Sequence, residues 1–457
     1  MEGVANRDEK SILEKSEVIG DACNENEPDP VPKFPVVSKI SGHLFEKEVI
    51  EKHIRDVGKC PKTGVLLTMD DLLVVPIEEP NPISAPPVLN GSFLSNGKTG
   101  EPSASPQFPY SIDEQMTYTR INLSQRRKRF REISQSLATA DALRGYIFNE
   151  GYTLHQTTVP GVLSLDIDNS EDIIATGGAD TNAVVFNQSS RKTVSTLSGH
   201  TDKVTSVKFV NEGELVVTGS SDKTVRVWRR SEKGSYKCRR ILHDHTAEVR
   251  AVTIHPSQKY FVTASLDCSW QFYDLSSESC VGRVACGTGS DSFSTAVFHP
   301  DGHIFGTCAA HVPGTCASGL VRFWDVAKQD DILQIDAHTG PVTSIAFSEN
   351  GYTLATAAAD GVKLWDLRFF RTMKTFPSDD KCTRRSVDFD HSGKYLATGG
   401  ELIRIYEIDK IDAALDPITT LCDMPDIGDV SCVKFGKDAK YVAAAGTSDS
   451  KLLLFGL

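Results

Sequence analysis

The most constraining feature of this sequence is a unit that repeats seven times between residue 162 and the last residue, 457. Each unit has an alternating apolar stretch, a turn, a second stretch, a turn with aspartate, and a strand closing on an aromatic residue. The closing aromatic residues are Phe186, Trp228, Tyr273, Trp324, Trp365, Tyr406 and Phe455. Their spacings are 42, 45, 51, 41, 41 and 49 residues. A period near 40–45 residues is typical of one propeller blade per unit, so the sequence predicts a seven-bladed β-propeller.

Short sequence signatures identify the type of blade. Three units end in a Trp-Asp or Tyr-Asp pair, and others open with Gly199-His200 or a remnant of it. Both signatures are typical of WD40 repeats. We therefore predict a mainly β chain whose WD40 propeller fills residues 151–457. Helical periodicity is absent from this half, which excludes alternating strand–helix architectures.

The end of the chain predicts how the ring closes. Leu457 lies two residues past Phe455, so only three strands follow Val430 in the last blade. We expect its fourth strand to come from residues 152–158, just before the first blade. Pairing the two ends of the propeller in this way buries both sheet edges and locks the circle.

Polar residues recur at blade spacing and predict a structural network in each blade. In the clearest blade, Asp222 is expected to accept hydrogen bonds from His200 and from backbone amides, with Ser220 and Trp228 completing the network. The corresponding sets are His245, Ser265 and Asp267 in one further blade, and His338, Asp360 and Trp365 in another. A Ser-His-Asp set is also the composition of hydrolase triads. Because a catalytic triad is not built three times over, we interpret these sets as structural.

Composition separates four zones ahead of the propeller. Residues 1–30 hold nine acidic and three basic residues and are predicted to be an acidic, disordered tail. Residues 31–77 have the pattern of a small α+β domain. Residues 78–121 are predicted to be a flexible linker, since 19 of the 32 residues at 80–111 are Pro, Ser, Gly or Asn. Residues 122–150 carry a basic segment and then a short helix.

Several classes of function are disfavoured by what the sequence lacks. A net charge of −12 argues against strong direct nucleic-acid binding. No apolar run approaches the ~18 residues of a membrane span. Phosphate-loop and dinucleotide motifs are missing. Cys23, His43, His53 and Cys60 lack the paired spacing of zinc ligands, so neither a metal nor another cofactor is predicted.

The basic segment has more than one interpretation. It contains Arg126-Arg127-Lys128-Arg129 followed by Arg131. We favour a nuclear import signal, and a weak RNA contact or a solvated linker patch are the alternatives. Eleven scattered cysteines, an odd number, are typical of a reducing compartment.

The small domain shows a strand, a hairpin arm, a helix and a loop in that order. Residues 35–38 are predicted to form the strand and residues 42–46 the arm. Apolar residues at helical spacing predict a helix over residues 46–57, which Gly58 ends. After a loop, residues 70–73 are predicted to begin a second helix.

This order resembles a U-box, the zinc-free relative of the RING domain. The stretches Pro35-Val-Val-Ser-Lys, Gly42-His-Leu-Phe-Glu-Lys and Gly58-Lys-Cys-Pro-Lys-Thr-Gly are similar to the U-box of the pre-mRNA-processing factor 19 family, most of all its plant form. Val204-Thr-Ser-Val-Lys-Phe-Val and the final Leu454-Phe-Gly-Leu extend the resemblance through the propeller.

The resemblance implies a nuclear ubiquitin ligase of a spliceosome-associated complex, acting in splicing and DNA repair. Its U-box would bind a ubiquitin-conjugating enzyme without forming a covalent intermediate, and its propeller would bind substrates or splicing-complex proteins. We assign Val36, Pro61 and Thr63 to the surface for the conjugating enzyme, because a rigid loop proline beside apolar residues forms a preformed patch. The alternative is a non-catalytic WD40 scaffold with a degenerate U-box.

Three departures from the family pattern keep that alternative open. The family's opening loop, Cys-x-Ile-Ser-Gly, is Cys23-Asn-Glu-Asn-Glu here, and Leu66 stands where the family has a loop proline. The family's coiled coil between U-box and propeller is replaced by the linker. Seven prolines in residues 78–121 do not permit several helical heptads, so we predict a monomer or a weak dimer.

Overall fold

The computed structural model describes residues 35–38, 44–57, 59, 66, 68, 72–74, 116–117, 119–125, 135–156, 161–168, 170–285, 292–309, 319–377, 386–408, 416–421, 430–446 and 450–457. Contacts divide the chain into two units, residues 1–99 and residues 100–457. Within the described residues, no helix is both long enough and apolar enough to cross a membrane.

The first unit contains a three-stranded antiparallel sheet and a helix. Its elements are β1 (Pro35–Ser38), β2 (Leu44–Glu46), α2 (Lys47–Val57) and β3 (Leu72–Val74), and the strand order is β2-β1-β3. The predicted strand and first helix are confirmed, and Ile50 and Ile54, one helical turn apart, are buried. The predicted second helix at residues 70–73 is wrong, because Leu72–Val74 pairs with β1. Leu72, Leu73 and Val74 are consecutive apolar residues and so lack the spacing of an amphipathic helix. They form a strand instead, because the backbone groups at the free edge of β1 can hydrogen-bond to them.

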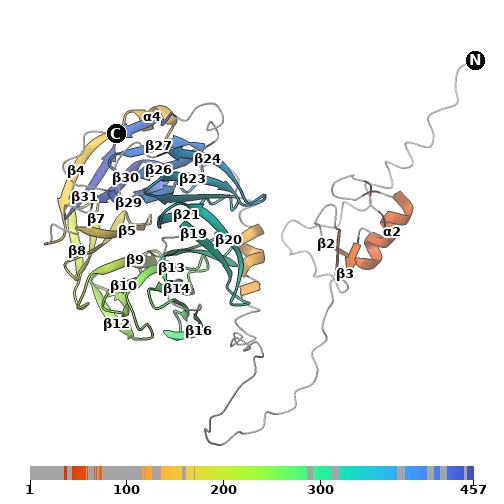
Figure 1. The fold of residues 1–457 in the computed structure, drawn as a ribbon, viewed down its shortest axis with the longest axis horizontal. Coiled ribbons are helices and arrows are strands. Elements are labelled where there is room, and N and C mark those ends of the chain that lie inside the picture. Colours follow the sequence, from red (N-terminus) through yellow and green to blue (C-terminus); the bar gives the residue numbers. More distant parts are fainter. Residues whose placement is uncertain are drawn as a thin grey trace, which may run out of the picture. The chain divides into compact units, whose positions relative to one another are not determined.

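The described part of the second unit contains seven four-stranded antiparallel sheets, which confirms the predicted propeller (Figure 1). Blade 1 has β5 (Val162–Asp168), β6 (Ile173–Gly178), β7 (Ala183–Asn187) and β8 (Lys192–Leu197). Blade 2 has β9 (Val204–Val210), β10 (Leu215–Ser220), β11 (Val225–Arg230) and β12 (Tyr236–Leu242). Blade 3 has β13 (Val249–Ile254), β14 (Tyr260–Ser265), β15 (Ser269–Asp274) and β16 (Ser279–Ala285). Blade 4 has β17 (Phe293–Phe298), β18 (Ile304–Ala309), β19 (Gly319–Asp325) and β20 (Asp330–His338).

The last three blades follow the same plan. Blade 5 has β21 (Val342–Phe347), β22 (Thr353–Ala358), β23 (Gly361–Asp366) and β24 (Arg371–Pro377). Blade 6 has β25 (Ser386–Phe389), β26 (Tyr395–Gly399), β27 (Ile403–Glu407) and β28 (Thr419–Leu421). Blade 7 has β29 (Val430–Phe435), the short helix η4 (Lys437–Ala439), β30 (Tyr441–Gly446), β31 (Lys451–Gly456) and β4 (Ile147–Thr153), which follows α4 (Ala140–Arg144).

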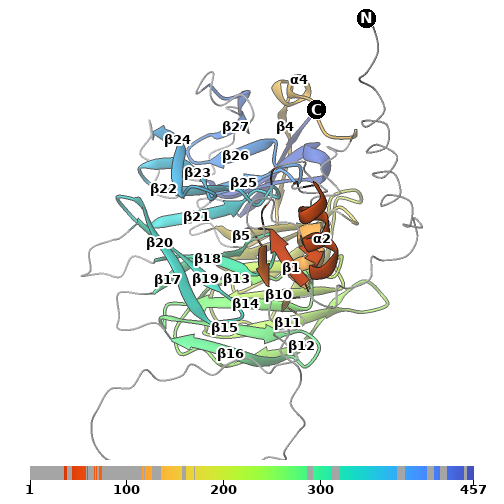
Figure 2. The same ribbon diagram turned by 90° about the vertical axis from the view of Figure 1, so that its right-hand side faces the viewer.

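Burial within a blade follows the position of each strand. The strands of blade 3 lie side by side from β13 to β16 (Figure 2). First strands contact the first strands of neighbouring blades and so line the centre of the ring. Second strands such as β10 and β14 are buried at every residue. Their side chains are apolar or small on both faces because a neighbouring blade covers each face. Fourth strands such as β16 form the exposed rim.

Serine side chains in the first strands join neighbouring blades. Ser164 Oγ accepts the Val207 amide of the next blade at 2.8 Å. Ser206 Oγ accepts the Val252 amide at 3.0 Å. Blades 5 to 7 repeat the contact. Ser344 Oγ accepts the Val387 amide, and Ser386 Oγ accepts the Val433 amide. These bonds satisfy inner-strand amides that have no ladder partner on that side.

The predicted exchange of strands between the two ends of the propeller is confirmed. Figure 1 shows β4 beside β31, and the two strands pair antiparallel in blade 7. The exchanged strand spans Ile147–Thr153 rather than the predicted 152–158. Its alternate residues are partly buried, and Phe148 packs edge-on against Phe455 at 5.8 Å. This alternation, with one face on the core, sets the register of the closing strand.

A helical stretch precedes the propeller and packs on it. Residues 116–117 and 119–125 are helical. Met116 is buried in the core cluster of blades 3 and 4, and Ser124 Oγ donates to Asp301 Oδ1 at 2.9 Å. The stretch overlaps the end of the predicted linker and the start of the predicted basic segment.

Closure of the ring is tested by removing the exchanged strand. Deleting residues 147–153 leaves β31 with an unpaired edge and uncovers apolar side chains of blade 7. We expect aggregation, or a melting temperature lower by roughly 10 °C or more, since each kcal/mol shifts it by several degrees. Deleting seven residues from the linker, 84–90, is the control. A soluble 147–153 deletion that melts with the control would contradict the closure.

Candidate functional site

A hydrogen-bonded relay crosses the interior of blade 2. His200 Nδ1 lies 2.8 Å from Asp222 Oδ2, and His200 Nε2 lies 2.8 Å from Thr218 Oγ1. The Trp228 indole donates to the same threonine oxygen at 2.9 Å. A carboxylate only accepts and an indole only donates, so the relay has one direction. Trp228 donates to Thr218, Thr218 donates to His200, and His200 donates to Asp222.

The predicted serine lies beside this relay and not within it. Ser220 Oγ donates to the Asp202 carbonyl at 3.1 Å and accepts the Asp222 amide at 3.1 Å. Ser265 occupies the same place in blade 3, where it accepts the amide of Asp267 at 3.1 Å. The serine therefore shapes the turn that presents the aspartate.

Histidine, threonine and aspartate form the same set in three further blades. The sets are His155, Thr176 and Asp180 in blade 1, His245, Thr263 and Asp267 in blade 3, and His338, Thr356 and Asp360 in blade 5. Trp365 donates to Thr356 at 2.9 Å, whereas blade 3 has Tyr273, which donates to Gln271. The sequence analysis missed every threonine and the whole blade 1 set. A threonine four residues before each turn aspartate was the available signal.

Electrostatics hold the relay of blade 2 in one protonation state. Burial lowers the pKa of His200, although Asp222 opposes the shift. For Asp222, burial alone would raise the pKa, but hydrogen bonds from Thr224, Thr201 and His200 outweigh it and lower the value to about 2. At neutral pH the imidazole is therefore neutral and the carboxylate ionised. The Thr218 side chain is fully buried, so no substrate reaches its hydroxyl, and the arrangement serves structure.

The residues assigned to conjugating-enzyme binding lie in the first unit. Val36 is in the central strand β1. Pro61 and Thr63 lie outside the described residues, so the surface formed by these three residues stays a prediction. Lys59 and Leu66, on either side of that stretch, form an antiparallel bridge. In the part of the chain that the structure describes, no three His, Cys, Asp or Glu side chains gather as a metal site would require.

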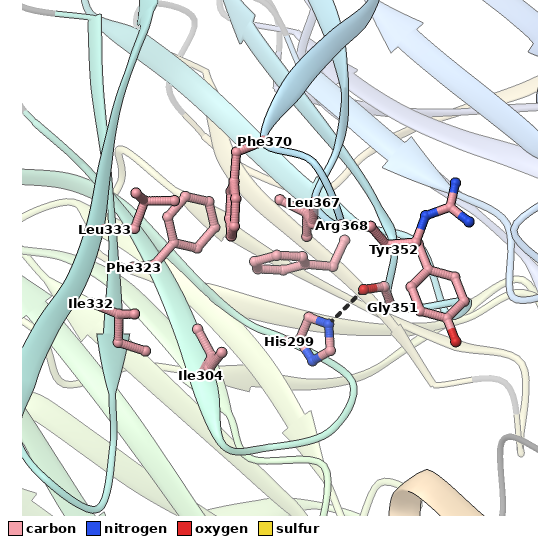
Figure 3. Close-up of a pocket in the computed structure, with 11 residues that line it drawn as sticks. His299, Ile304, Phe323, Ile332, Leu333, Gly351, Tyr352, Leu367, Arg368 and Phe370 are labelled. Atoms are coloured by element: carbon pink, nitrogen blue, oxygen red, sulfur yellow. Dashed lines mark hydrogen bonds between the residues drawn. The ribbon is translucent and has the colours of Figure 1, made fainter. Parts of the chain in front are cut away.

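An apolar pocket of about 210 Å³ opens between blades 4 and 5. Figure 3 shows Ile332, Leu333 and Phe323 of blade 4 facing Leu367 and Phe370 of blade 5. The complete lining is His299, Ile304, Phe323, Ile332, Leu333, Phe347, Gly351, Tyr352, Leu367, Arg368 and Phe370. The sequence analysis did not predict this pocket, because it depends on how the turns of two blades meet.

Buried histidines tie neighbouring blades together near this pocket. His299 Nε2 bonds the Gly351 carbonyl of blade 5 at 2.9 Å (Figure 3). His255 Nε2 bonds the Gly302 carbonyl of blade 4 at 2.9 Å in the same way. Both imidazoles donate through Nε2, because a carbonyl oxygen only accepts. Burial lowers the pKa of His255 to about 4.

Comparison with known proteins agrees with this architecture. The family described as WD domain, G-beta repeat matches residues 191–229, 236–274 and 330–366. Pre-mRNA-processing factor 19 homolog 2 of Arabidopsis thaliana is 41% identical over 513 residues, covering 93% of this chain and 95% of that protein. The chain belongs to the pre-mRNA-processing factor 19 family.

Other members of the pre-mRNA-processing factor 19 family match over a similar length. The rice protein is 41% identical with the same coverage, and the bovine protein is 30% identical over 92% of this chain and 97% of its own length. The resemblance stated from the sequence is thereby confirmed.

The central threonine is the sharpest probe of the relay. Thr218→Val keeps the shape but leaves the Trp228 indole without an acceptor and His200 Nε2 without a donor, both buried. Two unsatisfied buried groups cost about 2–4 kcal/mol of unfolding free energy. Thr196→Val on the exposed strand β8 is the control. Urea denaturation should separate the two variants, and equal midpoints would show that the relay contributes nothing.

The lowered pKa of His255 predicts that the protein becomes less stable as the pH falls. This pKa falls from 6.5 to about 4 on folding, so below pH 6.5 the unfolded chain binds a proton that the folded chain does not. The stabilisation is complete above pH 6.5 and decreases by about 2 kcal/mol as the pH falls to 5. His255→Gln lacks this contribution and should lose less stability over the same range. Denaturation curves at pH 7.5 and 5.0 measure the difference, and identical losses would contradict the assignment.

Proposed function

We propose that this chain is a nuclear U-box ubiquitin ligase associated with the spliceosome. Its first unit binds a ubiquitin-conjugating enzyme, and its propeller recruits substrates or splicing-complex proteins. The observation that carries the proposal is the 41% identity to a pre-mRNA-processing factor 19 homolog across 93% of the chain, a span that includes both units. Roles in pre-mRNA splicing and DNA repair follow from the family resemblance.

Two exposed apolar side chains support a binding surface in the first unit. Leu66 is 72% exposed and Val57 at the end of α2 is 55% exposed. Leu66 follows the stretch that contains Pro61 and Thr63. Apolar groups close in sequence to a proline, whose ring restricts the backbone, are suited to a partner surface, because little entropy is lost when they are buried.

A second candidate function is a non-catalytic WD40 scaffold in the splicing complex. It is favoured by the opening loop at residues 23–27 and by Leu66, where the family pattern has an isoleucine and a proline respectively. An autoubiquitination assay with a ubiquitin-conjugating enzyme separates the two candidates, because only the first forms chains.

We also propose that the chain is a monomer or a weak dimer. The alignment with the Arabidopsis protein spans 513 positions, more than the 457 residues of this chain, so that protein has segments with no counterpart here. The proline content of residues 78–121 supports a linker in place of a coiled coil.

The proposed surface is tested by Pro61→Ala. Loss of the rigid ring should reduce ubiquitin chain formation about tenfold, equivalent to about 1.4 kcal/mol of binding free energy. The melting temperature should not change. Pro86→Ala in the linker is the matched control and should keep full activity. Equal activity of the two variants would remove Pro61 from the surface, and an inactive natural chain would favour the scaffold.

A further inference from the structure

Exposed apolar side chains gather at one place on the propeller. Ile332 of β20 is 52% exposed, and Phe370, in the turn between β23 and β24, is also 52% exposed. Tyr352, Phe369 and Met373 of blade 5 are exposed as well. Ile332, Tyr352 and Phe370 line the pocket between blades 4 and 5. Exposed apolar side chains gathered around a pocket are typical of a site where another molecule binds.

The size of the pocket indicates the kind of group that enters it. Drug-sized ligands occupy pockets of roughly 300–1,000 Å³. At about 210 Å³, this pocket has room for a single large side chain. Its inner walls are Phe323, Leu333 and Phe347, and Figure 3 shows the guanidinium of Arg368 directed away from its centre. The interior therefore suits an aliphatic or aromatic group.

Side chains of opposite charge directly adjoin, in the sequence, the residues that form the two lips of the pocket. On the blade 5 lip, Arg368 is already paired with Asp366 at 2.8 Å and 3.0 Å. Arg371 directly follows Phe370 and lies over the Phe369 ring at 5.1 Å. It forms no salt bridge with another described residue, although it is the cross-strand partner of Asp366 and its charge lowers the pKa of that carboxyl group. On the blade 4 side, Asp330 and Asp331 directly precede Ile332 and are exposed at the start of β20, where Asp331 accepts a hydrogen bond from Gln334.

We propose that this pocket binds an extended segment of a partner protein, in which a large apolar residue stands between an acidic and a basic residue. The apolar side chain fills the pocket, the carboxylate pairs with Arg371, and the basic group lies by Asp330 and Asp331. Opposite charges on the lips fix the direction of the segment, because the reversed orientation places like charges together. The inference rests on the proposal that the propeller recruits proteins, and it is independent of ligase activity.

The test uses the full chain and an array of random dodecapeptides. Enriched peptides should carry Leu, Ile, Met or Phe with an acidic residue on one side and a basic residue on the other. Ile332→Lys places an ammonium at the mouth of the pocket and should weaken binding of an enriched peptide at least tenfold, about 1.4 kcal/mol. Ile241→Lys is the matched control, since Ile241 is also exposed on the fourth strand of its blade.

A charge reversal tests the lips separately. Arg371→Glu should replace the acidic residue of the enriched peptides by lysine or arginine, while the apolar residue is retained. Enrichment without charge bias, or equal effects of Ile332→Lys and Ile241→Lys, would overturn the proposal. So would a lack of enriched peptides combined with self-association in light scattering that Ile332→Lys abolishes, because the occupant would then be a second copy of the chain.

The outcomes also separate this inference from the proposed function. Ubiquitin chain formation without peptide enrichment would contradict only the proposal that the pocket binds a partner segment. Enrichment in a chain that forms no ubiquitin chains would leave the pocket in place and favour the scaffold.

Discussion

Neither face of a four-stranded blade can be buried within the blade itself, and this constraint shapes the whole propeller. Strands such as β10 and β14 are buried on both faces, so each blade needs a neighbour on either side. A row of six blades would leave two apolar faces in water. The ring is therefore completed by the pairing of β4 with β31 in the seventh sheet, and by the contact of β29 with β5 of blade 1.

Within this apolar frame, buried polar groups give each blade its geometry. The serine bonds between first strands set the distance from blade to blade, and the histidine relays fix the position of the turns. Neutral histidine beside ionised aspartate is tolerated in the interior because every donor in the relay finds an acceptor. By contrast, the apolar side chains of Ile332, Tyr352 and Phe370 lie exposed at the rim of the pocket between blades 4 and 5.

The aromatic spacing was sufficient to predict the number of blades, because one residue per blade marks the period. Closure was predictable too, since a three-stranded last blade leaves an edge to be filled. Thr218 was not predicted because threonine is an ordinary strand residue and its hydroxyl is informative only when its neighbours are known. His155 was missed because it precedes the first repeat unit, beside the exchanged strand. The pocket arises from the contact of two turns far apart in the sequence, which no local pattern records.

The exchanged strand also has a consequence for how the protein is made. Thr153 leaves the ribosome nearly 300 residues before its partner Lys451. At roughly 5–20 residues per second, the nearly 300 intervening residues keep β4 waiting for about 15–60 s. During that time the nascent chain carries a growing arc of blades with an open face at its end. Chaperones that shield such faces, and premature termination anywhere in the final blade, would act on this interval, because the ring is whole only after β31 has been synthesised.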